Sequence, residues 1–106
     1  MARRVAWTAA ALIDLETAAS YIAEDSVRYA AAFVREARDA ARSLARLAER
    51  GRVVPEFKEP SIRELFVRNF RLIYRVTEGT VYVIGFIHGA RDLRRARERE
   101  GNKNPE

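Results

Sequence analysis

The sequence predicts an α+β fold in which an antiparallel helical hairpin packs on one face of an antiparallel β-sheet. Two observations indicate this class. Between residues 9 and 50, apolar residues recur every three or four positions, which is the spacing of an amphipathic helix. After Ser61 the spacing falls to two, as in strands that bury one face. Two amphipathic helices need an apolar surface to cover, and such a sheet provides one.

The chain is expected to begin with a short strand followed by a helix. Val5 and Trp7 occupy alternate positions within residues 3–7, which predicts the strand. The hydroxyl of Thr8 can accept a free N–H from the first turn of a helix over residues 9–24. The apolar stripe of this helix is expected at Leu12, Leu15, Ala19 and Ile22.

A second helix is expected from residue 27 to residue 50. Asp25 or Ser26 can cap its start, and Gly51 stands where a left-handed residue often ends a helix. Because the link between the two helices is short, they should run antiparallel. The expected apolar stripe of the second helix is Tyr29, Phe33, Ala37, Ala40, Leu44, Leu47 and Ala48.

Three strands should follow an ordered, proline-containing loop over residues 52–61. Arg68-Asn69 and Glu78-Gly79 have the residue types of tight turns, so the three strands should form an antiparallel meander. The strands are expected at Ile62–Val67, Phe70–Val76 and Thr80–Ile87.

The 106 residues suit one domain, expected over residues 1–100, with a short helix at 93–99 and a flexible tail at 101–106. The chain has no cysteine, which excludes disulfides, cysteine-ligated zinc and a thiol nucleophile. Asp14 and Glu16 interrupt the early apolar stretch, so we expect neither a signal peptide nor a membrane span. A cytoplasmic location is expected from these features together.

The chain is basic, with 20 Lys and Arg against 15 Asp and Glu, a net charge of +5 and a sequence pI of about 10.2. Of the 20, only Lys58 and Lys103 are lysine. The planar fork of arginine binds phosphate and carboxylate bidentately, so a nucleic acid, a ribosome or an acidic protein is a fitting partner. A compositional bias towards arginine, which the many alanines accompany, explains the same count equally well.

Basic residues are expected on one face of the strand over residues 70–76. Alternation leaves Arg71 and Arg75 on the face away from the helices, and Arg63 and Arg68 lie close by in sequence. This face would bind phosphate or an acidic partner, or it would be an ordinary solvated sheet face. The apolar face, expected under the helices, comprises Phe70, Leu72, Tyr74 and Val76.

His88, the single histidine, ends the last expected strand, just before Gly89. A histidine there could move a proton in phosphodiester cleavage while Arg71 and Arg91 stabilise the developing charge. A purely structural histidine fits the pattern as well. One histidine and no acidic cluster make a metal site unexpected, and no cofactor motif is present.

Two further basic runs stand out. Arg94 and Arg95 begin a C-terminal run that Glu98 and Glu100 dilute, and it would be solvated or would contact nucleic acid or an acidic protein. The second helix carries a row that reads as a solvent face or as a surface for an acidic partner segment. That row is Arg35, Arg38, Arg42 and Arg46.

The stretch from Gly51 to Asp92, within the strand–hairpin–meander layout, resembles the ParE/RelE superfamily of type II toxin–antitoxin toxins. The resemblance spans nearly the whole chain, and its specific part begins at Ile62. It is carried by Gly51-Arg52-Val53-Val54-Pro55-Glu56, Ile62-Arg63-Glu64-Leu65, Asn69-Phe70-Arg71-Leu72-Ile73-Tyr74-Arg75-Val76 and Ile87-His88-Gly89-Ala90-Arg91-Asp92.

The resemblance implies a toxin neutralised by a cognate antitoxin, commonly encoded beside it, with promoter DNA bound only through the antitoxin. Members of the RelE-like branch cleave mRNA on the ribosome, whereas members of the ParE-like branch poison DNA gyrase without hydrolysis. The resemblance therefore implies a plasmid-stabilisation or growth-inhibition role and one of two targets. A non-toxic basic module that binds nucleic acid or protein is the alternative of another class.

Residue by residue, Arg71 matches the arginine that follows an aromatic residue in RelE-like nucleases, and Arg91 matches their basic residue near the last strand. The nuclease lysines of the preceding strand fall on Ile62 and Glu64, and the late tyrosine after Arg91 is missing. The His-Gly-x-Arg-Asp ending is closer to ParE-like members. The resemblance thus favours a gyrase inhibitor, with a nuclease using Arg71, Arg91 and His88 as the alternative.

The antitoxin is expected to bind outer apolar positions of the helical hairpin or an exposed sheet edge. Phe57, in the loop after the second helix, could anchor that partner or could tuck the loop onto the core.

Overall fold

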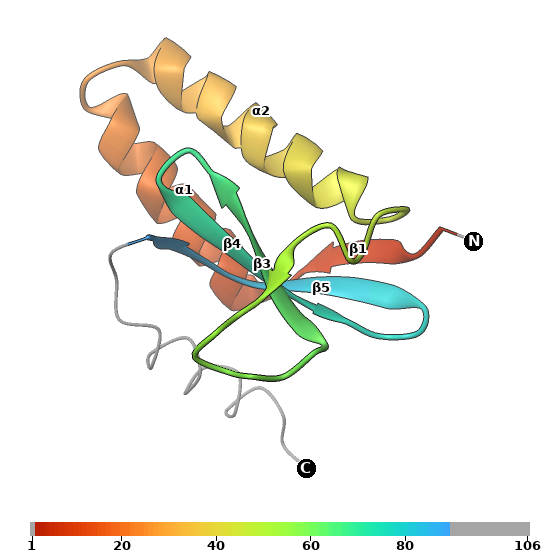
Figure 1. Ribbon diagram of the computed structural model, residues 1–106. Helices are drawn as coiled ribbons and strands as arrows, with labels where there is room; N and C mark the ends of the chain where they lie inside the picture. The colour runs from red at the N-terminus through yellow and green to blue at the C-terminus, as the bar shows by residue number, and fades with distance from the viewer. Residues whose placement is uncertain (1, 90–106) are drawn as a thin grey trace.

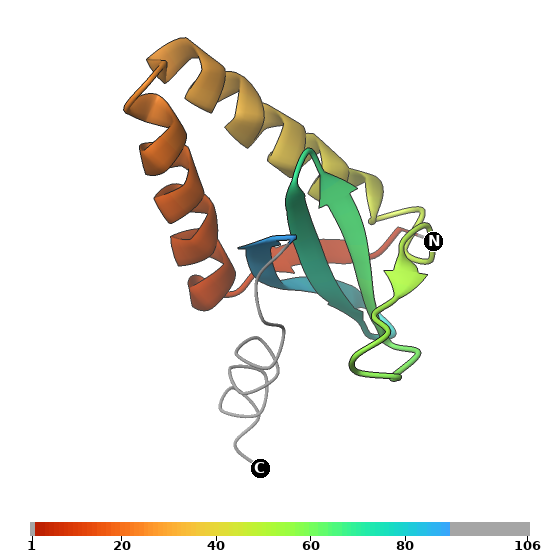
Figure 2. The ribbon, with the colours of Figure 1, turned by 60° about the vertical axis from the view of Figure 1, so that its left-hand side comes forward.

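The computed structural model describes residues 2–89. Both helices lie on the same side of the sheet and meet at one end in a short turn (Figures 1 and 2). This arrangement confirms the α+β class and the helical hairpin on one sheet face. The elements in chain order are β1 (Arg4–Trp7), α1 (Ala9–Ala23), α2 (Val27–Ser43), β2 (Arg52–Val53), β3 (Ile62–Val67), β4 (Phe70–Val76) and β5 (Thr80–His88).

The sheet has five strands in the order β1-β5-β4-β3-β2 and is mixed rather than a three-stranded meander. The meander of β3, β4 and β5 is as predicted, but β1 adds to it in parallel, with Arg4 opposite Thr80 and Trp7 opposite Val83. On the other side, β2 pairs antiparallel with β3. The sequence missed β2 because two residues are too short to show alternation.

Helix α1 starts as predicted, and Leu15 and Ile22 of its predicted stripe pack in the core, but the buried side is shifted around the helix. The Thr8 hydroxyl accepts a hydrogen bond from the Ala11 N–H at 3.1 Å. The buried positions are Ala11, Leu15 and Ala18, whereas Leu12, expected in the stripe, is 38% exposed. Small alanines line the contact because they let the helix backbone lie close to the sheet. Three large apolar side chains of α1, those of Leu12, Ile13 and Tyr21, are therefore left exposed.

Helix α2 starts where Ser26 caps it, but it ends at Ser43 and not at residue 50. The Leu44 N–H bonds to the carbonyl of Ala41, three residues back, which tightens the chain into turns. The Ala45 carbonyl accepts the N–H of Arg3, the residue just before β1, at 2.8 Å, which ties these turns to the start of the chain. The predicted stripe is partly wrong, because Tyr29 and Leu47 are exposed.

The main core lies between the helices and the sheet. Three of its rings, Phe33, Phe70 and Phe86, meet with centroids 5.2–5.7 Å apart, and Phe70 and Phe86 are stacked. Leu72 and Tyr74 share this core, as the alternation of β4 predicted. The other buried members of this core are Ala11, Leu15, Ala18, Ala37, Ala41, Leu44, Ala48, Val67, Val81 and Val83.

A register shift between β4 and β5 brings Phe86 into that core. Ile73 lies opposite Gly85 while Tyr74 lies opposite Val83, so Ile84 is an extra residue in β5. Without the extra residue, strict alternation would turn Phe86 away from Val83 and towards the other face. A hydrogen bond of 3.1 Å from the Phe86 N–H to the Asp14 carboxylate ties this part of β5 to α1.

The face of the sheet away from the helices is partly covered rather than open. Val54, Ile62 and Ile73 form a second buried cluster, and Phe57 packs against it. Phe57 thus tucks the loop onto the sheet, as one of its two readings predicted. This second cluster explains why the loop between β2 and β3 is ordered around its prolines.

Candidate functional site

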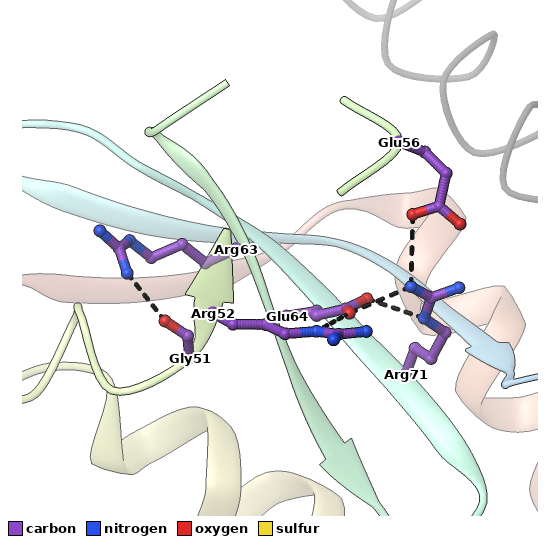
Figure 3. A network of polar contacts seen from close by, with 6 residues as sticks. All are labelled: Gly51, Arg52, Glu56, Arg63, Glu64 and Arg71. Carbon is purple, nitrogen blue, oxygen red and sulfur yellow. Dashed lines mark hydrogen bonds and ion pairs between the residues drawn. The ribbon is translucent and has the colours of Figure 1, made fainter. Parts of the chain in front are cut away.

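A buried ion network occupies the covered face of the sheet, at the position where the sequence predicted an open basic surface (Figure 3). Its centre is the Glu64 carboxylate, whose side chain is fully buried. The Arg71 guanidinium donates from Nε to Oε1 at 2.7 Å and from Nη2 to Oε2 at 3.0 Å. The Arg52 Nε donates to Oε2 at 2.6 Å, so two arginines share one carboxylate.

Arg71 was expected to be exposed, and this prediction is wrong. The residue is 6% exposed, and its Nη2 also reaches the Glu56 carboxylate at 3.5 Å. The hydrogen bonds to Glu64 raise the pKa of the Arg71 guanidinium above its ordinary value, against the lowering effect of burial. Alternation did place Arg71 on the face away from the helices. It could not show that the loop and Glu64 cover that face.

The charges within this network cancel one another. Two positive groups, Arg52 and Arg71, balance two negative groups, Glu56 and Glu64. A guanidinium that makes a bidentate bond to a buried carboxylate has few donors left for a phosphate. Because Glu56 belongs to the loop and Arg52 to β2, the network fastens both segments to the centre of the sheet. We interpret this ion network as a structural one that stabilises the fold, and not as an anion-binding site.

A second set of polar contacts joins the same region to the end of the helical hairpin. The Tyr74 hydroxyl accepts the Gly51 N–H at 3.0 Å and donates to the Ala48 carbonyl at 2.8 Å. Burial raises the pKa of the Tyr74 phenol. Arg63 donates to the Gly51 carbonyl at 2.8 Å, so this candidate arginine also serves the fold.

Gly51 is needed for space and not as a left-handed cap, which corrects the prediction. No glycine among residues 2–89 has a positive φ. A Cβ built on Gly51 would lie 2.5 Å from the Glu64 carbonyl oxygen and 2.6 Å from the Tyr74 hydroxyl. The backbone therefore approaches β3 more closely than any side chain would permit.

Arg68, another candidate, fixes the β3–β4 turn to α2. It adopts a positive φ of 55° in the two-residue turn that Arg68-Asn69 predicted. Its guanidinium donates to both oxygens of Glu36, at 2.9 and 2.7 Å, and lies 4.4 Å from the centre of the Tyr29 ring. The hydrogen bonds lower the pKa of Glu36 and raise that of Arg68. This contact explains why Tyr29 lies outside the core.

Residues 5–93 match a family model described as the ParE toxin of the type II toxin–antitoxin system, parDE. The chain belongs to this ParE toxin family. A solved structure described as "Chromosomal ParDE TA system from P. aeruginosa" has the same fold, with a TM-score of 0.67 at 20% identity. The match covers 81% of this chain and 95% of that one. No curated protein matches the chain significantly.

In this ParE family member, the residues expected of a nuclease do not come together. His88 lies opposite Phe70 and contacts its ring edge-on, with centroids 5.5 Å apart, on the helix side of the sheet. Arg71 lies opposite Ile87, on the other face. The third member of the expected nuclease set, Arg91, lies outside the described residues, as do Arg94, Arg95, the predicted helix over residues 93–99 and the predicted tail.

The other candidates are also spread over the ParE fold. Arg63 lies near the start of β3 and Arg68 follows its end, so they do not form one surface. Arg75 lies further along β4, opposite Ile62 and Tyr82. Within residues 2–89, no group of three or more metal-binding side chains gathers, and neither helix is long and apolar enough to cross a bilayer.

The central residue that sequence reasoning missed is Glu64. A signal was present, because alternation puts Glu64 beside Ile62 on a face that also holds Arg71 and Ile73. A carboxylate among apolar side chains, next to an arginine on the neighbouring strand, indicates a buried ion pair. Arg52 and Glu56 gave no such signal, since Arg52 lies in a strand of only two residues and Glu56 in the loop that follows it.

Proposed function

We propose that this ParE-family toxin inhibits DNA gyrase without hydrolysing a substrate and that a cognate antitoxin neutralises it. The observation that supports a non-hydrolytic toxin is the bond between Arg71 and Glu64. The arginine that a RelE-like nuclease would aim at phosphate is buried and donates to a carboxylate. His88 lies on the opposite face of the sheet, so the two cannot act on one phosphodiester.

The gyrase target is tested with purified chain and purified gyrase. We expect loss of supercoiling and accumulation of cleaved DNA held in the gyrase complex. A chain denatured and left unfolded serves as the control. No effect on supercoiling and no trapped cleavage would refute the proposed target.

A parallel assay on translating ribosomes distinguishes the proposed gyrase inhibitor from a ribosome-dependent nuclease. We expect no codon-phased cuts in mRNA, and an Arg71→Lys chain with wild-type fold should cut no differently. Phased cuts that disappear in this variant would overturn the proposal in favour of a ribosome-dependent endonuclease. Unchanged growth when the toxin is induced without its antitoxin would favour a non-toxic binding module.

We place the antitoxin on the outer side of α1. Ile13 is 61% exposed and Tyr21, two turns further along α1, is 74% exposed. Large apolar side chains in solvent are costly unless a partner covers them, and an amphipathic helix is the partner that such a surface fits. The neighbouring reading frame is the candidate source of the antitoxin.

This interface is tested by titrating the antitoxin into the toxin. Ile13→Asp should weaken binding by at least about tenfold, because it puts a charge at the centre of an apolar contact. Tyr82→Asp is the matched control, since Tyr82 is partly exposed on β5, away from the helices. Equal affinity of the Ile13→Asp chain and the wild type would refute this placement.

A further inference from the structure

The solvent side of α2 carries a row of arginines that the proposed function does not use. Arg28, Arg35 and Arg42 are spaced by seven residues, so each lies about 20° around the helix from the one before it, and all three fall within about 40°. Arg38 lies beside them, and all four are exposed. We call these four residues the α2 row. Arg46, which the sequence analysis grouped with them, follows the end of the helix at Ser43.

The charge of the α2 row is largely unneutralised. Asp39 pairs with Arg42. Glu36, on the edge of the row, is held by Arg68 from the β3–β4 turn. Within residues 2–89, the other three arginines of the row form no ion pair. The helix thus presents three guanidinium groups without an acidic partner on one side.

We propose that the α2 row is a docking surface for the phosphate backbone of B-form duplex DNA. From Arg28 to Arg42 the helix rises about 21 Å, at about 1.5 Å per residue. A duplex presents roughly a dozen phosphates over that length, since it carries one charge per about 1.7 Å. Because each arginine donates from a fixed fork, the row can contact several phosphates at once.

The composition of this helix side favours a phosphate backbone over an acidic protein. Protein interfaces draw most of their binding energy from buried aromatic and large apolar side chains. The apolar residues between the arginines are the small Ala31 and Ala32, and the one larger apolar side chain on this side, Val27, lies at the N-terminal end of the row. Contacts to phosphate need charge and donors and no apolar anchor. We place the antitoxin on α1 instead, where the large apolar side chains of Ile13 and Tyr21 are exposed.

The same helix side favours a B-form duplex over other nucleic acids. Single strands bind where aromatic side chains stack on the bases, and none lies among these arginines, since Tyr29 is on another side of α2, in contact with Arg68. A helix of about 10–12 Å diameter fits the major groove of B-form DNA, about 12 Å wide. The major groove of an A-form duplex is too narrow and deep for such a helix.

The proposal is tested by fluorescence anisotropy with the full chain and a labelled duplex of about 20 base pairs, over a series of salt concentrations. The logarithm of the binding constant should fall linearly with the logarithm of salt concentration. The triple variant Arg28→Gln, Arg35→Gln, Arg38→Gln should lose about tenfold or more in affinity at low salt. It should also lose about 2 to 3 units of the salt slope.

The matched control is Arg4→Gln, Arg50→Gln, Lys58→Gln, which removes the same total charge from other exposed positions. We expect less than about threefold loss from it. Circular dichroism of both triple variants checks that the fold is retained. Equal losses from the two variants would show diffuse attraction and overturn the proposal.

Two other results would also overturn the proposal. One is tighter binding of single-stranded DNA or duplex RNA than of duplex DNA. The other is tighter binding of an acidic polypeptide, lost in the α2-row variant. The assay contains no gyrase and no antitoxin, so its failure leaves the proposed function untouched, and failure of the gyrase assay leaves this proposal untouched.

Discussion

Arg71 donates two hydrogen bonds to the fully buried carboxylate of Glu64, at 2.7 and 3.0 Å, across neighbouring strands of the sheet. Because of this pair, the Arg71 guanidinium is buried against a carboxylate and is not exposed to bind phosphate. It also connects β2 and the following loop to the sheet, through Arg52 and Glu56. The stability of this face should therefore depend on the pair more than on any exposed ion pair.

Removing the Glu64 charge tests this dependence. Glu64→Gln should lower the free energy of unfolding by about 3 kcal/mol, because it leaves the Arg71 guanidinium buried without a counter-charge. Urea unfolding measures the change. The control is Asp39→Asn, which breaks the exposed pair with Arg42 and should change stability by less than about 0.5 kcal/mol.

Replacing both members of the pair should restore most of the loss. Glu64→Leu combined with Arg71→Met removes both buried charges and keeps similar volume, a change that is often neutral or stabilising. A double variant as unstable as Glu64→Gln alone would show that the charges do not set the stability of this face. Loss of growth inhibition in the stable double variant would contradict the reading of the network as structural.

A methyl group at Gly51 should be costly while one at Gly79 should not. Gly51→Ala would bring a Cβ within 2.6 Å of both the Glu64 carbonyl and the Tyr74 hydroxyl, so strand or helix must shift. Such overpacking costs about 1–3 kcal/mol. Gly79→Ala meets nothing within 4 Å and serves as the control. Thermal unfolding compares them, and equal stability of the two variants would refute the close approach.

The Tyr74 phenol should make stability depend on alkaline pH. Burial raises its pKa in the folded chain above the ordinary value of about 10. The neutral phenol therefore stabilises the fold fully below about pH 10, and this contribution is lost as pH rises through the folded pKa. Urea unfolding at about pH 8 and about pH 11 measures the loss.

Tyr74→Phe should remove that part of the alkaline dependence. It should also cost about 1–3 kcal/mol near neutral pH, since the Gly51 N–H and the Ala48 carbonyl lose their buried partner. Tyr21→Phe, at an exposed position, is the control and should change neither quantity. An alkaline loss that persists unchanged in Tyr74→Phe would refute this assignment.

The contact between Arg68 and Glu36 should appear in an acid titration. Hydrogen bonding by Arg68 lowers the pKa of Glu36. Its contribution to stability is present above the ordinary glutamate pKa of about 4.3 and is lost as pH falls through the lowered value. Arg68→Gln should return the Glu36 pKa towards ordinary, as read by carboxyl NMR, whereas Arg42→Gln should leave it unchanged.

Much of the fold could be predicted because its causes are local. The Thr8 and Ser26 caps, the Arg68-Asn69 turn and the apolar face of β4 depend on neighbours in sequence, and all are as expected. The end of α2 was misplaced because its cause is distant. The helical period continues past Ser43, but the backbone of Arg3 holds Ala45 in a turn.

The sequence by itself determined the class of the fold, the order of its main elements and the ParE family resemblance. The hydrophobic period, the helix-capping residues and the family motifs depend only on residues that are close together in the sequence. Only the tertiary structure decided what the candidate arginines do. Alternation showed that Arg71 faces away from the helices, but the loop and Glu64 that bury it are brought there by folding. A charge is exposed or neutralised by what packs over it, and that contact joins residues far apart in sequence.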